Sequence, residues 1–162
     1  MGLDMYLKKR VYLGEESEWS GTKTKVSITR KNKNGDWTDV PFKDKVNEIV
    51  VSVGYWRKAN AIHKWFVDKV QEGVDDCKEY YVSPEQLKEL LSICKKIVDN
   101  PAMSGNVLPT QSGFFFGGTE YDEYYMQDIK NTIEIIEKVL KDEEDCKLEG
   151  GILGDYYYQS SW

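Results

Sequence analysis

A run of polar and aromatic side chains at residues 54–66 has the residue types that bind planar, charged ligands. Trp56, Asn60 and His63 stand at i, i+4 and i+7, so on a helix they share one stripe. An aromatic ring, an amide and an imidazole suit a planar ligand, and Arg57 and Lys64 beside Asn60 would balance phosphate charge. The alternative is structural: Trp56 covers a sheet, while Asn60 and His63 satisfy the backbone groups of a loop.

His63 is the only histidine of the chain, and the acidic pair Asp75-Asp76 or the tyrosine pair Tyr80-Tyr81 could approach it in space. A histidine beside a carboxylate can act as a general base. No residue pattern fixes a nucleophile next to it, so a hydrogen-bonded or ligand-contacting role is favoured. The cysteines and His63 lack the close spacing of metal ligands, and we expect neither a metal nor a cofactor.

A second segment, residues 108–125, combines hydroxyls, an amide, glycines and aromatic rings. Gly117 and Gly118 precede a predicted helix, whose N-terminus attracts anions. Acidic residues at 120, 122 and 123 would repel a phosphate there, so a sugar hydroxyl, a base edge or a basic partner fits better. We expect Gln111, Ser112 and Tyr121 to contact the ligand. The alternative is a glycine-framed strand followed by a self-capped helix.

The overall composition is that of a globular protein. The chain has 162 residues, of which 40% are hydrophobic and 31% charged, which fits one domain spanning residues 1–162. Its apolar runs are too short to cross a bilayer, and its start lacks the features of a secretory signal. The three cysteines are odd in number and widely spaced, so we expect free thiols and a cytoplasmic location.

Charge is distributed unevenly along the chain. Residues 1–70 carry a net charge of +5 and residues 71–162 a net charge of −11, within a total of −6. This asymmetry fits either a basic site on an acidic body or simply two solvated acidic helix faces. Binding of duplex nucleic acid through a broad basic surface is not expected at this net charge.

The predicted strands and helices that position these residues do not alternate regularly. They indicate an α+β domain with a mainly antiparallel sheet and three main helices. An acidic loop is expected at 14–21, and a type I′ turn at Asn34-Gly35 between strands 23–30 and 37–40. Ser83 and Gln86 form a capping box ahead of the second helix, and Thr119 is the expected cap of the third. The predicted helices are 55–71, 84–99 and 120–142; the other predicted strands lie within 5–13, 45–53, 79–82, 112–119 and 152–158.

The C-terminus is aromatic, with three consecutive tyrosines at 156–158 and Trp162. Such a segment must be buried or it forms a sticky patch, so it docks on its own sheet or on another subunit. One short helix with its flanking loops cannot enclose a whole dinucleotide. We therefore expect a homo-oligomer, in which a neighbouring subunit completes the site.

Four distinctive stretches are spread over most of the chain: GLDMYL at 2–7, YWRKANAIHKWFV at 55–67, GVDDC at 73–77 and LPTQSGFFFG at 108–117. With these stretches the chain resembles a family of small proteins encoded by bacteriophages and prophages. The resemblance implies a protein made in the host cytoplasm and, by analogy, a counter-defence factor that sequesters a nucleotide immune signal. It assigns no catalytic residue.

These features are compatible with three functions. The first is a non-enzymatic binder of a small nucleotide-like ligand through Trp56, Arg57, Asn60, His63 and Lys64. The second is an inhibitor whose acidic C-terminal half engages a basic host protein, which would require carboxylates spread over one exposed face. The third is an enzyme that cleaves a nucleotide through His63, which would require His63 and a carboxylate to meet in an open cleft.

Overall fold

The computed structural model describes residues 2–13 and 25–162, and the predicted acidic loop at 14–21 lies outside this part of the chain. The described residues belong to two compact units. The first unit contains the start of the chain up to Arg10 and residues Val50–Trp162, and the second unit lies within Val11–Ile49. The fold is α+β, as predicted.

A four-stranded sheet forms the base of the first unit, in the order β4-β1-β6-β5. Its strands are β1 (Asp4–Tyr12), β4 (Glu48–Arg57), β5 (Tyr80–Val82) and β6 (Asp155–Ser161). Strand β6 is antiparallel to both β1 and β5, so it is an inner strand of the sheet. Tyr156 and Tyr158 point into the core from β6, and Tyr157 is only partly buried.

The second unit contains a hairpin of β2 (Ile28–Lys31) and β3 (Trp37–Val40), which pair in antiparallel register. Among the described turn residues only Gly35 has a positive φ, of 93°, so the predicted type I′ turn is wrong. The backbone N–H of Asn32 donates to Asp36, and the side chain of Asn32 accepts from Asn34 and Asp36. This side-chain cap favours a longer loop with one left-handed residue.

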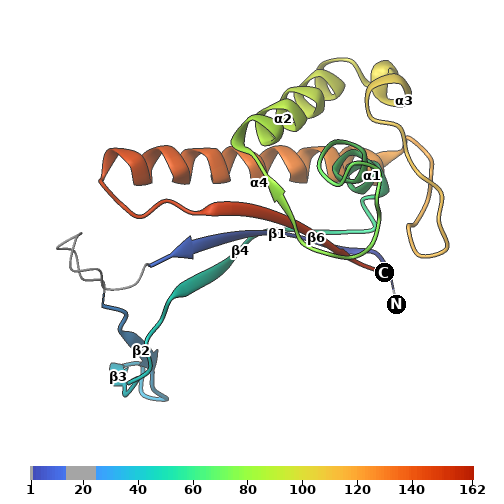
Figure 1. Ribbon diagram of the computed structural model, residues 1–162. Helices are drawn as coiled ribbons and strands as arrows, with labels where there is room; N and C mark the ends of the chain where they lie inside the picture. The colour runs from blue at the N-terminus through green and yellow to red at the C-terminus, as the bar shows by residue number, and fades with distance from the viewer. Residues whose placement is uncertain (1, 14–24) are drawn as a thin grey trace. The chain divides into compact units, whose positions relative to one another are not determined.

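Three long helices lie on one side of the four-stranded sheet (Figure 1). They are α1 (Asn60–Lys69), α2 (Pro84–Asp99) and α4 (Glu123–Leu148); the short η1 (Pro101–Met103) and α3 (Ser104–Val107) follow α2. Helix α2 has the predicted bounds and the predicted capping box. Helix α4 begins three residues later than predicted, because Asp122 and not Thr119 accepts hydrogen bonds from its first turn.

Helix α1 begins at Asn60, so the predicted start at residue 55 is wrong. Tyr55 and Trp56 belong to β4, where Trp56 points into the core and Tyr55 away from it. The period-two burial of a strand therefore replaces the helical stripe expected for Trp56. Lys58, at a φ of 59°, turns the chain from β4 into α1.

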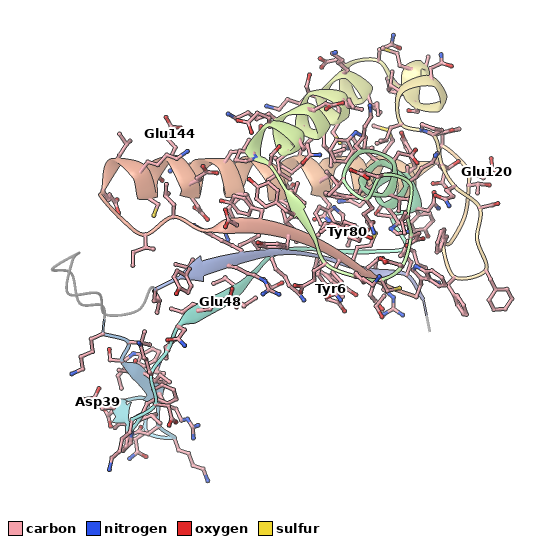
Figure 2. All side chains as sticks on the ribbon, in the orientation of Figure 1. Tyr6, Asp39, Glu48, Tyr80, Glu120 and Glu144 are labelled. Atoms are coloured by element: carbon pink, nitrogen blue, oxygen red, sulfur yellow. The ribbon has the colours of Figure 1, made fainter. Side chains whose placement is uncertain are left out.

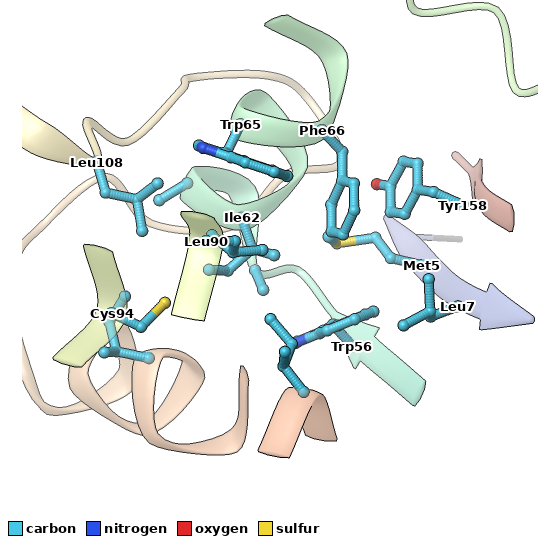
Figure 3. Packing of buried hydrophobic residues seen from close by; sticks show 14 of the residues in the cluster. Met5, Leu7, Trp56, Ile62, Trp65, Phe66, Leu90, Cys94, Leu108 and Tyr158 are labelled. Atoms are coloured by element: carbon cyan, nitrogen blue, oxygen red, sulfur yellow. The ribbon is translucent and has the colours of Figure 1, made fainter. Parts of the chain in front are cut away.

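The core between sheet and helices is rich in aromatic rings. Phe66 of α1 stacks on Tyr158 of β6 with ring centroids 4.0 Å apart, and Trp56 lies below them beside Leu7 (Figure 3). The predicted strand at 112–119 is wrong: this segment is a loop in which Phe114 is 95% exposed and Phe116 is buried. Phe116 anchors this glycine-rich loop on the core, and Phe115 packs against the core beside it.

Cys77, Cys94 and Cys146 are free, as predicted. In the described part of the chain, no helix has the length and apolar character needed to cross a membrane.

Candidate functional site

His63 of α1 lies in a closed hydrogen-bond network in the interior. Its side chain is fully buried, with Nδ1 at 2.7 Å from Oη of Tyr158 and Nε2 at 2.9 Å from Oδ2 of Asp75. The other Asp75 oxygen accepts from Nε1 of Trp162 at 3.1 Å. The predicted approach of Asp75 to His63 is confirmed, but both ring nitrogens are occupied and neither faces an open cleft. This arrangement holds β6 and the C-terminus against α1.

Trp56 and Lys64 are also engaged elsewhere. The Trp56 ring is 1% exposed, and its Nε1 donates to Oγ1 of Thr132 on α4 at 2.9 Å. Lys64 pairs with Asp68 one turn later on the helix surface, at 2.6 Å. The expected stripe of Trp56, Asn60 and His63 is thus a set of buried structural contacts made by a strand and a helix.

The Asn60 side chain organises the loop that precedes α4. Its Nδ2 donates to the backbone oxygens of Phe116 and Gly118, at 3.1 and 2.7 Å, and its Oδ1 accepts from the backbone N–H of Gln111 at 3.0 Å. Asn60 therefore fixes both arms of the 110–118 loop against the start of α1. Gln111 takes part through its backbone, and Ser112 beside it is exposed.

Tyr121 supports this loop from the other side. Its ring packs on Tyr125 with centroids 5.0 Å apart, and its hydroxyl oxygen accepts from the backbone N–H of Thr110 at 3.4 Å. The Thr110 hydroxyl in turn donates to the Thr119 oxygen at 2.9 Å. These contacts close the loop on itself.

The loop, the start of α1 and the first turns of α4 enclose a cavity of about 310 Å³, here called the α1–α4 cavity. Glu120, labelled in Figure 2, belongs to the loop side of its wall. Of the eight predicted ligand-binding residues, Arg57 and Asn60 line it, and the other six do not. The remaining lining residues are Lys58, Ala59, Ala61, Ile62, Thr110, Gly117, Gly118, Glu120, Asp122, Tyr124, Tyr125, Gln127, Asp128 and Ile129.

The first turn of α1 lines this cavity, and the helix has no side-chain N-cap. Its N-cap residue is Ala59, which has no side-chain acceptor, and the turn holds no acidic residue. No backbone or side-chain acceptor among the described residues takes the N–H groups of Ala61 and Ile62. These two donors carry the positive end of the helix dipole, so the cavity wall attracts an anion at this point.

The second helix start in the cavity is already neutralised. Asp122 accepts from the backbone N–H groups of Tyr124 and Tyr125 at 3.0 and 3.1 Å, as an N-cap does. The expected repulsion of an anion by the acidic residues before α4 therefore applies to α4, whereas the start of α1 has no such carboxylate.

Lys58 joins β4 to α1 in a strained conformation. Its φ of 59° lies in the left-handed region, which is unfavourable for a side chain of this kind. The facing Gly117 has a φ of 86°, and a Cβ there would lie 3.3 Å from Cβ of Lys58. Glycine therefore lets the loop pass close to Lys58, at the edge of the cavity.

Asp128 of α4 contributes a carboxylate to the cavity that forms no hydrogen bond or ion pair with any described residue. Burial, together with the negative charge of Asp122, raises the pKa of Asp128 to about 6. At neutral pH this carboxylate is ionised, and no residue within 2–13 or 25–162 donates to it. Such groups concentrate at functional sites.

Sequence reasoning missed most of the cavity wall, including Lys58, Tyr124 and Asp128. A partial indication was present, because the Gly117-Gly118 pair drew attention to this loop and to the helix after it. The helical spacing of residues 125–140 marks the buried side of α4, but it does not tell an exposed polar position from one that faces a cavity.

No protein-family model, curated protein or solved structure matches this chain. Within the described residues, no group of histidine, cysteine, aspartate and glutamate side chains could hold a metal ion.

Proposed function

We propose that this protein binds a small nucleotide-like ligand in the α1–α4 cavity and does not transform it. The observation that carries the proposal is the uncapped start of α1, which presents unpaired N–H donors to a cavity that Arg57 and Lys58 also line. Helix N-termini with nearby cations bind phosphate groups.

The charge on the wall favours a ligand with a single anionic end. Arg57 has 61% of its side chain exposed and only a long contact, 4.0 Å, with Asp4, so it is free to reorient toward a ligand. Glu120, Asp122 and Asp128 line the same cavity and oppose a highly charged polyphosphate. A single phosphate bound at the start of α1 would be attracted by the cations of the wall, and it would be repelled by the carboxylates less than a polyphosphate would.

The size and the other walls favour a mononucleotide. A volume of about 310 Å³ lies at the lower end of the range for small-molecule sites, roughly 300–1,000 Å³. Tyr124 and Tyr125 of α4 supply aromatic surface, and Ile62 and Ile129 supply apolar surface. A planar base can pack on such surfaces while its phosphate is held at α1.

Binding without chemistry is favoured over cleavage by His63. The imidazole is fully buried and both of its nitrogens are engaged, whereas a general base must reach the proton it abstracts. His63 is also absent from the cavity wall.

The acidic interaction inhibitor remains the second candidate, but ion pairs weaken its case. Glu137 pairs with Lys95 at 2.6 Å, and Asp145 pairs with Lys141 at 2.5 Å. These lysines neutralise part of the negative charge on α4, so its surface carries both positive and negative charge. With the resemblance to phage-encoded proteins, sequestration of a nucleotide signal in the host cytoplasm is the biological role we propose.

Native mass spectrometry of the purified chain with a panel of nucleoside monophosphates tests this proposal. We expect an intact nucleotide to be retained by the wild type and to be lost, or bound several-fold more weakly, by Arg57→Ala. Arg30→Ala, which removes an exposed arginine of the hairpin, is the matched control and should bind as the wild type does. Absence of any retained nucleotide would overturn the proposal, and a cleaved product would replace it with the enzyme.

A further inference from the structure

The Asp128 carboxylate has no hydrogen-bond donor among the described residues, and this indicates which nucleotide base the cavity would bind. Asp128 lines the cavity together with Gln127 and Tyr124, and none of the described residues donates to its carboxylate. Arg57 and Lys58, the cations of the same wall, form no ion pair with it. A carboxylate that is partly removed from water is stabilised by additional donors, and a ligand in the cavity can supply them.

Two carboxylate oxygens accept two parallel N–H bonds when the donors are side by side. Among the common bases, guanine presents such a pair on one edge, formed by its ring N1–H and its 2-amino group. On that edge adenine has one donor beside an acceptor, cytosine has one donor followed by two acceptors, and uracil has one N–H between two carbonyl oxygens. The acceptor pair of Asp128 is therefore complementary to guanine.

Aromatic surface stands next to this carboxylate. Tyr124 lies on the same helix and is 82% exposed, so its ring is free to cover a base. Tyr125 is buried, with its hydroxyl donating to the Leu108 oxygen at 3.0 Å, and forms a fixed part of the wall. Stacking on tyrosine holds a base without selecting it, so the selection falls to the carboxylate.

We infer that the α1–α4 cavity is selective for a guanine nucleotide, with the Asp128 carboxylate accepting from N1–H and the 2-amino group of the base. This inference rests on the proposed function, since it assigns the base of the ligand that the cavity binds.

Isothermal titration calorimetry of the wild type with GMP, IMP and AMP at pH 7.5 tests the selectivity without any mutation. IMP keeps N1–H but lacks the 2-amino group, and the loss of one charge-assisted hydrogen bond should weaken binding about tenfold or more. AMP should bind more weakly than IMP, since its ring nitrogen would face the carboxylate as a second acceptor.

The variant Asp128→Asn assigns the selectivity to this residue. An amide offers one acceptor and one donor, so GMP should bind about tenfold or more weakly and the preference over AMP should shrink. Asp142→Asn removes an exposed carboxylate of the same helix and should leave the GMP-to-AMP ratio unchanged.

The outcomes separate this inference from the proposed function. If GMP, IMP and AMP bind equally, or if Asp128→Asn leaves their ratio unchanged, guanine selectivity is overturned and nucleotide binding stands. If none of the three binds the wild type at millimolar concentration, the proposed function fails as well.

Discussion

Two polar regions of helix α1 differ in how their hydrogen-bonding groups are used. Along the helix, His63 has both ring nitrogens engaged, and its partner Asp75 is engaged again by Trp162. At the helix start, the N–H groups of Ala61 and Ile62 have no acceptor among the described residues. Polar residue types alone therefore do not identify a ligand-binding site. Polar groups saturated by the protein support the fold, whereas unsaturated groups at a cavity are available to a ligand.

The largest effect on stability is expected at His63. His63→Ala leaves the Tyr158 hydroxyl and the Asp75 carboxylate without their partner and opens a void in the aromatic core. We expect the free energy of unfolding to fall by roughly 3 kcal/mol, measured by urea denaturation. Nucleotide affinity should stay within a factor of about two for the folded fraction. Loss of binding with unchanged stability would place His63 in the site and contradict the comparison.

Asn60 joins the two regions, because it is buried but holds the cavity loop. Asn60→Ala removes the bonds to Phe116, Gly118 and Gln111. We expect a loss of about 2 kcal/mol in stability, together with faster amide hydrogen exchange in residues 110–118 and weaker nucleotide binding. An unchanged exchange rate in this loop would show that Asn60 does not position it.

The Asp128 carboxylate should lower the stability of the ligand-free protein at neutral pH. Its pKa is raised to about 6 in the folded state, above the value of about 4 in an unfolded chain. The folded state therefore binds the proton more tightly, and stability falls as pH rises from about 4 to about 6.

Asp128→Asn removes this charge and should stabilise the protein by about 1 kcal/mol at pH 7.5, a value reduced from the full shift because the carboxyl is partly solvated. Ionisation of Asp128 should lower the melting temperature of the wild type between pH 4 and 7. This contribution should be absent in Asp128→Asn and present in Asp142→Asn. A destabilised Asp128→Asn would mean that the carboxylate has a structural partner.

The smallest effect on stability is expected at Arg57, since its guanidinium is largely exposed and its contact with Asp4 is long. Arg57→Ala should change the free energy of unfolding by less than about 0.5 kcal/mol. Its nucleotide affinity should fall about five- to tenfold and depend less on salt concentration, because a screened charge interaction is lost. Affinity titrations at two ionic strengths measure both quantities, and an unchanged salt dependence would exclude a phosphate contact by Arg57.

The sequence predicted those parts of the fold that depend on local chemistry. Ser83, Pro84 and Gln86 set the start of α2 through a capping box, which is readable from four residues. The start of α1 was misread, because Tyr55 and Trp56 fit both a helical stripe and the alternation of a strand. Pairing with β1 settles this ambiguity, and that is a long-range contact.

The candidate site was harder to predict for the same reason. Arg57 and Asn60 were identified from their types, but Asp128 and Lys58 meet at the cavity only through tertiary packing. The left-handed φ of Lys58 has no local signature, since lysine seldom adopts it. The absence of a cap at α1 also depends on the residue at which the helix begins, which its sequence pattern does not determine.

Two-dimensional amide NMR during a titration with GMP distinguishes ligand binding at the unsaturated start of α1 from ligand binding at the buried histidine of the same helix. If the start of α1 binds the ligand, the amide resonances of Ala61 and Ile62 shift most, followed by those of Gly117, Gly118 and Tyr124, because these residues line the cavity. Resonances of Asp75 and Trp162 should remain in place. Shifts centred on Asp75, Trp162 and the His63 side chain, with Ala61 and Ile62 unmoved, would contradict binding at the start of α1.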